Sequence, residues 1–139
     1  MDDRASYGYF DDISATGTPL TFTGTIPLDD GEATIDIPFN FLFHGLQFNR
    51  VRVGVNGVVG FDESAEIDFV NYPLPINRIM GTNVTDRFFA PFWDDLDTTY
   101  GGQVLWQVKG SAPYRRLIVQ WQDVPHYAGA VSSPSGATF

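Results

Sequence analysis

Short stretches in which apolar and polar residues alternate recur along the chain, separated by turn residues. The clearest is 33–41, where the odd positions are apolar and most even positions are polar. A strand with this period turns one face to the core and the other to water. Pro38 lies inside the stretch and predicts an edge position or a bulge, because proline cannot donate to the ladder. Long stretches with helical spacing are absent, so the pattern predicts strands.

The turn residues between these stretches predict hairpins. Residues 20–26 are expected to pair with 33–41 around an Asp-Asp-Gly turn, and His-Gly makes the next turn. A second hairpin spans 51–61 and turns at Asn56-Gly57. We predict a type I′ turn there, in which both central residues have positive φ.

The second half of the chain predicts one more clear hairpin, with arms 103–109 and 115–121. Residues 87–93 are apolar and predict a short buried strand. A short helix, if there is one, is expected between Glu63 and Arg87. The in-phase apolar positions define a predicted core of Phe39, Phe41, Val53, Val55, Phe61, Phe92, Trp106, Val119 and Trp121.

These elements predict an all-β fold, an antiparallel β-sandwich of Greek-key or jelly-roll type with few or no helices. We expect a single domain over 1–139 that lacks its C-terminal strands, because 137–139 read as the opening of a further strand. A sandwich of this kind leaves an unpaired edge. We therefore expect self-association, or completion by a strand from a partner protein. The equally weighted alternative is that 139 is only the boundary of a fragment or of a trimmed tail.

The composition narrows the function classes. Eight basic and seventeen acidic residues give a net charge of −9, which disfavours binding to nucleic acid or to an anionic membrane surface. No apolar run approaches the roughly 20 residues that span a bilayer, so membrane insertion is not expected. The chain has no cysteine, which excludes disulfides and thiolate ligands.

An acidic segment offers the best candidate for chemistry. Asp94, Asp95 and Asp97 carry carboxylates on one predicted turn, and calcium prefers several oxygen ligands. The spacing of an EF-hand loop is missing. The alternative is a solvated turn whose carboxylates cap backbone N–H groups, with no cofactor at all.

Two aromatic residues are candidates for binding. Tyr100 and Tyr127 lie in predicted loops and could stack on sugar rings, whereas the tryptophans on strands belong to the core. Asn56 and Gly57 are assigned a structural role in their turn. No serine-elbow or metalloprotease motif occurs, so no catalytic residue is assigned.

The order of several motifs is similar to a known family. The chain carries Pro-Phe-Asn-Phe at 38–41, Asn-Gly followed by Phe61, Pro-Phe-Trp-Asp-Asp at 91–95, and the segment 115–127. This order resembles the nidogen-like β domain of bacterial secreted and cell-surface proteins. A Ser-Asn-Gly is usual in that family where this chain has Val55-Asn-Gly.

The resemblance implies a non-catalytic, extracellular module, secreted or at the cell surface, with a structural or adhesive role. Two other functions remain open. A carbohydrate-binding module would present exposed aromatic side chains on one face, and an accessory or catalytic domain of a secreted hydrolase would place two carboxylates across a cleft.

Overall fold

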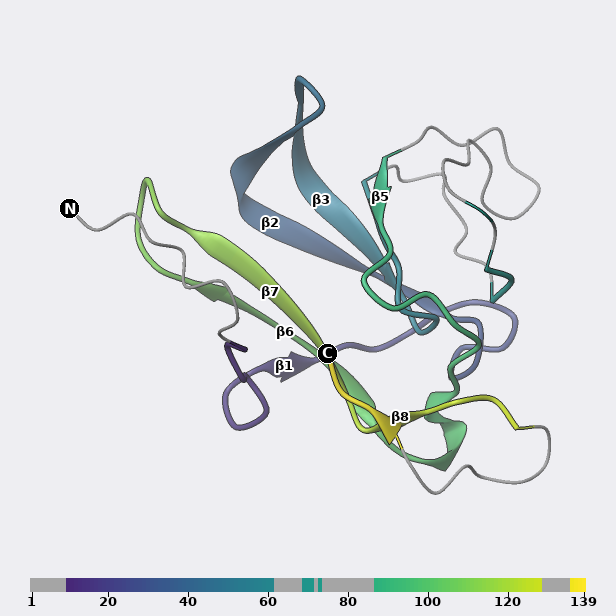
Figure 1. Ribbon diagram of the computed structural model, residues 1–139. Coiled ribbons are helices and arrows are strands. Elements are labelled where there is room, and N and C mark those ends of the chain that lie inside the picture. Colours follow the sequence, from purple (N-terminus) through teal and green to yellow (C-terminus); the bar gives the residue numbers. More distant parts are fainter. Residues whose placement is uncertain (1–9, 62–68, 72, 74–86, 129–135) are drawn as a thin grey trace.

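The protein folds as an antiparallel β-sandwich (Figure 1). The computed structural model describes residues 10–61, 69–71, 73, 87–128 and 136–139. Within these residues the only helical element is the single 3₁₀ turn η1, Thr98–Tyr100. The all-β fold class predicted from the alternating pattern is therefore confirmed, and the expected position for a helix, 63–87, lies mostly outside the described residues. No described helix has the length and apolar character needed to cross a membrane.

The larger sheet has four antiparallel strands in the order β2-β3-β4-β5, so each strand lies beside its sequence neighbour. Their bounds are β2 Glu32–Phe43, β3 Leu46–Gly54, β4 Val59–Gly60 and β5 Phe88–Phe89. The pairing of β2 with β3 shifts register between Asp36 and Phe41, around Pro38. That irregularity, and the edge position of β2, are what a proline inside a strand predicts.

The second sheet has the order β1-β6-β7 and lies across from the first (Figure 1). Its strands are β1 Thr18–Pro19, β6 Gln103–Lys109 and β7 Arg116–Gln122. The long hairpin of β6 and β7 confirms the clearest prediction in the second half of the chain. A short additional pair joins β8, Val124–Pro125, to β9, Gly136–Ala137.

Two details of the predicted hairpins are wrong. Residues 20–26 do not form a strand against β2: the one backbone bridge is between Thr23 and Glu32, and β2 pairs along its length with β3. The type I′ turn lies at His44-Gly45, whose φ angles are 48° and 78°. At the Asn-Gly turn only Gly57 has positive φ, at 77°.

The core between the sheets contains most of the predicted residues. Val53, Val55, Phe61 and Trp121 are buried, and the other in-phase residues pack half-buried against them: Phe39, Phe41, Trp106 and Val119. The indole N–H of Trp121 donates to the carbonyls of Gly54 and Val55, at 3.2 and 3.0 Å. This side chain therefore links β7 to the end of β3.

Phe92 is the exception among the predicted core residues. It is 38% exposed, because the predicted buried strand 87–93 is reduced to the two residues of β5 and the chain then enters a turn. The Phe92 ring contacts the rings of His126 and Phe139 at the surface. Strand parity fails to place a side chain once the strand has ended.

Candidate functional site

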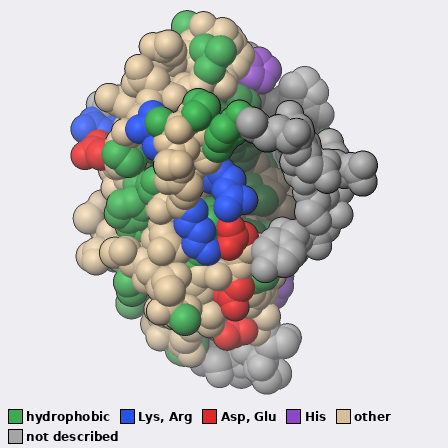
Figure 2. All heavy atoms as spheres, turned by 90° about the vertical axis from the view of Figure 1, so that its left-hand side faces the viewer, with side chains coloured by type: hydrophobic (Ala, Val, Ile, Leu, Met, Phe, Trp, Pro, Cys, Tyr) green, Lys and Arg blue, Asp and Glu red, His purple; other side chains and the backbone are tan. Residues whose placement is uncertain are grey.

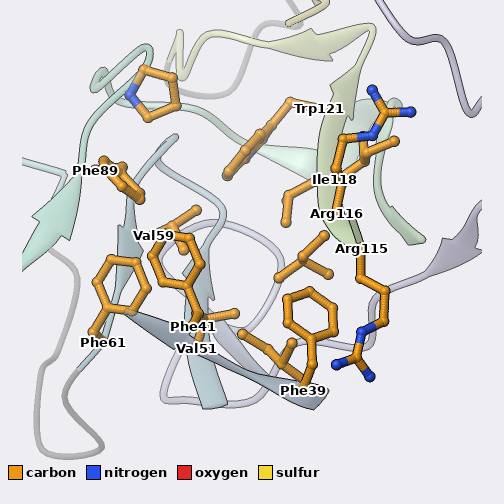
Figure 3. Close-up of a pocket in the computed structure, with 14 residues that line it drawn as sticks. Phe39, Phe41, Val51, Val59, Phe61, Phe89, Arg115, Arg116, Ile118 and Trp121 are labelled. Atoms are coloured by element: carbon orange, nitrogen blue, oxygen red, sulfur yellow. The ribbon is translucent and has the colours of Figure 1, made fainter. Parts of the chain in front are cut away.

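An apolar groove of about 460 Å³ lies between β7 and the larger sheet (Figure 3). Side chains from β2, β3, β4 and β5 form one wall, and five consecutive residues, Arg115 and the first four of β7, form much of the other. The lining consists of Ile37, Phe39, Phe41, Val51, Val59, Phe61, Phe89, Pro91, Arg115, Arg116, Leu117, Ile118, Val119 and Trp121. Consecutive residues of a strand point to opposite faces of the sheet. Because residues from both faces of β7 line the groove, the groove lies along the edge of this strand.

The outer edge of β7 is paired at one end. Trp121 and Phe139 exchange two backbone hydrogen bonds, each 3.0 Å long, and their rings stack at 4.8 Å. In an antiparallel ladder the groups that point to one side belong to alternate residues. The N–H and C=O groups of Val119 and Leu117 therefore point to the same outer edge as those of Trp121.

Those two residues have no backbone partner on that side among the described residues. The strand order β1-β6-β7 likewise places β7 at the end of its sheet. An edge with unpaired donors and acceptors next to an apolar groove is a template for pairing with another extended segment.

Two arginines line the end of the groove at the start of β7. The Arg115 guanidinium lies 5.0 Å from the centre of the Phe39 ring and donates to the Pro38 carbonyl at 3.2 Å. Arg116 points to the other face, where it pairs with Asp11 at 3.1 Å. On the face toward which the β6–β7 turn points, basic side chains lie directly beside acidic and apolar ones (Figure 2). The groove thus has an apolar floor and a cationic end.

A second constellation is acidic. Asp29, Asp30 and Asp95 each place one carboxylate oxygen within 4.8 Å of the others, an arrangement that fits a metal ion. Oδ1 of Asp29 is buried and has no hydrogen-bond partner among the described residues. Carboxylate oxygens are the ligands that calcium prefers, so these residues are the ones that would hold such an ion.

Burial and neighbouring negative charges disfavour the ionised form of two carboxyl groups in the aspartate cluster. Burial, followed by repulsion from Asp30, Asp97 and Asp95, raises the pKa of Asp29 to about 6. Burial, with repulsion from Asp30, Asp94 and Asp97, also raises the pKa of Asp95, against a smaller opposing effect of His126. A bound cation would remove this repulsion.

The structure brings only one of the three predicted metal ligands into this cluster. Asp97 is buried and accepts a hydrogen bond from the Thr99 N–H at 2.7 Å, which caps η1. Asp94 lies 3.3 Å from Nδ1 of His126. Sequence reasoning missed Asp29 and Asp30, which were assigned to a turn; their signal was the acidic pair itself.

Asn56 connects the two loops that form the cluster. It is only 1% exposed. Its Nδ2 donates to Oδ1 of Asp30 at 3.1 Å, and its Oδ1 accepts from the Leu96 N–H at 2.8 Å. Gly57 lets the turn approach the next loop, since a Cβ there would lie 1.9 Å from the Phe92 carbonyl oxygen.

The two candidate sugar-binding tyrosines lie in loops at the surface, as expected for ligand contact. Tyr100 is 50% exposed at the end of η1, and Tyr127 is 49% exposed. The Tyr127 N–H donates to the carbonyl of Asp95 at 2.8 Å. Neither tyrosine lines the groove, and a sugar-binding role stays a prediction.

The described lining of the groove carries no carboxylate, histidine or hydroxyl side chain. In the aspartate cluster, one carboxylate oxygen from each residue lies within 4.8 Å of the others, a spacing that suits coordination of an ion.

Comparison of the chain with known proteins identifies a matching family. A family model described as NIDO related matches residues 3–138. Mouse (Mus musculus) alpha-tectorin is 26% identical over 135 residues, which cover 81% of this chain and 6% of alpha-tectorin. No solved structure matches.

Proposed function

Because this chain belongs to the NIDO-related family, we propose that it is a non-catalytic extracellular module with a structural or adhesive role, which acts by binding other polypeptides. The similarity to alpha-tectorin supports an extracellular location. The resemblance to nidogen-like domains extends the proposal to a bacterial protein, secreted or at the cell surface.

The open groove along β7 is the observation that carries the proposal. Its walls are apolar over the length that the unpaired edge follows. A contiguous apolar surface of this kind is typical of a protein contact. A small polar substrate would find few hydrogen-bonding side chains there, whereas a polypeptide can satisfy both the apolar walls and the backbone edge.

Substitution in the groove tests this proposal. Leu117→Lys places a charge on the groove face, and Ser111→Lys places the same charge on the exposed β6–β7 turn. Each chain would be immobilised and exposed to the secreted proteins of the source cells, with circular dichroism to verify folding. We expect wild type and Ser111→Lys to retain the same proteins and Leu117→Lys to lose them. Equal retention by all three would contradict a role for the groove.

A second function, calcium binding, is favoured by the geometry of the aspartate cluster. Three carboxylates converge there and one buried oxygen has no partner among the described residues. We propose that calcium at Asp29, Asp30 and Asp95 fastens the loops that Asn56 connects. The ion would be structural, since it would lie in a loop cluster whose residues do not line the groove.

A further inference from the structure

We propose that Asn56-Gly57 is a gated deamidation site: the folded chain shields the pair, and separation of the neighbouring loops lets Asn56 convert to isoaspartate or aspartate. Asn56 is the one asparagine in the sequence that precedes a glycine. The pair lies apart from the groove, whose lining includes neither residue.

The reaction needs only the chain and water. The backbone nitrogen of the residue after an asparagine attacks Cγ of the asparagine side chain, and glycine allows this approach because it has no Cβ. The new C–N bond closes a five-membered succinimide ring while the side-chain nitrogen leaves as ammonia. Water then opens the ring at one of its two carbonyls. The product is isoaspartate or aspartate, and the chain gains one negative charge.

The fold requires both residues of this reactive pair. The Asn56 side chain donates to Oδ1 of Asp30 and accepts from the Leu96 N–H, so the position calls for a side chain that is both donor and acceptor. Gly57 has a φ of 77°, and a Cβ there would lie 1.9 Å from the Phe92 carbonyl oxygen. Neither residue can therefore be exchanged for a less reactive one without disturbing this turn.

The folded geometry blocks each requirement of the reaction. The Gly57 N–H donates to the Gly54 carbonyl at 3.3 Å, which occupies the attacking nitrogen. The two hydrogen bonds of Asn56 fix its amide at both ends. Asn56 is 1% exposed and Gly57 is buried, so the water that opens the ring has little access. Deamidation must wait until the loops that carry Asp30 and Leu96 move away from Asn56.

Modification would prevent the loops from closing again. A carboxylate at position 56 has no proton to donate to Asp30 and repels its negative charge. Isoaspartate also adds a methylene to the main chain in the turn between β3 and β4, where the Gly57 backbone packs against Phe92. Opening of this region is thereby converted into a permanent change of the chain.

Peptide mapping by mass spectrometry tests the gate. Wild-type chain would be incubated at about pH 8 without divalent cations, folded in one sample and unfolded by guanidinium chloride in another, and the products at Asn56 would be quantified. We expect deamidation of Asn56 to be at least about tenfold slower in the folded sample, since its rate scales with the open fraction. Asn49, which is exposed but precedes Arg50, is the internal control and should react slowly in both samples. Equal rates at Asn56 in the two samples, or equal rates at Asn56 and Asn49 in the unfolded one, would overturn the proposal.

Two variants test which contact holds the gate. Asp30→Ala removes the acceptor of Asn56 Nδ2 and should speed deamidation of the folded chain by roughly two- to tenfold. Asp36→Ala removes an exposed carboxylate from β2 and should leave the rate unchanged within about twofold. Circular dichroism verifies that both variants fold. An unchanged rate in folded Asp30→Ala would contradict the assigned gate.

Refolding of the modified chain tests the permanence of the change. The deamidated fraction, separated from the unmodified chain by its added charge, would be returned to native buffer. We expect it to unfold at a lower temperature than unmodified chain carried through the same steps. Equal melting temperatures of the two fractions would contradict loops that the modification keeps open.

Discussion

Phe139 is paired with Trp121 through both backbone and side chain: two hydrogen bonds of 3.0 Å join the two residues, and their rings stack at 4.8 Å with an interplanar angle of 12°. Phe139 thereby covers one end of an edge whose next outward-facing residues, Val119 and Leu117, have no backbone partner among the described residues. Both of these residues line the apolar groove that we propose as a contact surface.

Trp121 is expected to be the most costly core side chain to remove. It is buried, and its indole N–H reaches the carbonyls that end β3. Trp121→Ala should lower the free energy of unfolding by about 3–5 kcal/mol, because it leaves a cavity and removes the indole donor from the Gly54 and Val55 carbonyls. Denaturant unfolding measures this. A loss below about 1 kcal/mol would show that Trp121 does not join the two sheets.

Replacing Asn56 is also expected to destabilise the fold, because its side chain makes two hydrogen bonds to other loops. Asn56→Ala leaves the Leu96 N–H without its acceptor and removes the amide that holds Asp30. We expect a loss of about 1–3 kcal/mol in the free energy of unfolding. Asn49→Ala is the matched control, since Asn49 is exposed on β3 and its loss should change stability by less than about 0.5 kcal/mol. Equal effects of the two variants would argue against a linking role for Asn56.

The raised pKa of Asp29 predicts how stability depends on pH. A carboxyl group whose pKa is about 6 in the folded chain and 3.8 when unfolded binds its proton more tightly in the folded state. Its contribution to stability is therefore complete below pH 3.8 and is lost as the pH rises through about 6. Asp29→Asn should stabilise the chain at pH 7 relative to wild type, and this difference should vanish near pH 4. Thermal unfolding across this range gives the answer, and a difference that grows toward low pH would have the wrong sign.

Calcium should relieve the same repulsion. Millimolar calcium is expected to raise the melting temperature by mass action, and more strongly at pH 7 than at pH 5, because protons compete for the carboxylates. Asp95→Asn should abolish the shift. Asp36→Asn, which alters an exposed aspartate on β2, should preserve it. No shift in wild type would leave the aspartates as capping and turn residues without a metal.

The period-two pattern predicted the fold class, the β6–β7 hairpin and much of the core, because those features depend on local alternation and burial. Partners that depend on distant segments were less predictable. Residues 20–26 have strand-like composition but meet the edge strand β2 at a single bridge, because the chain just before them, Thr18 to Leu20, pairs with β6 in the other sheet. Positive φ at His44 could not be foreseen from its residue type alone.

The candidate site was likewise predictable only where it depends on local sequence. Asp95 was recognised from the run of acidic residues, but its approach to Asp29 and Asp30 depends on two loops that Asn56 joins across the fold. The groove was anticipated only as an unpaired edge near 137–139. Its position depends on how β7 packs against the larger sheet, which no local pattern contains.

Amide hydrogen exchange along β7 tests the unpaired edge most directly. In the free chain, the amides of Ile118 and Gln120 point toward β6 and should be protected, whereas those of Leu117 and Val119 point outward and should exchange rapidly. Uniform protection of all four amides would contradict an open outer edge at β7.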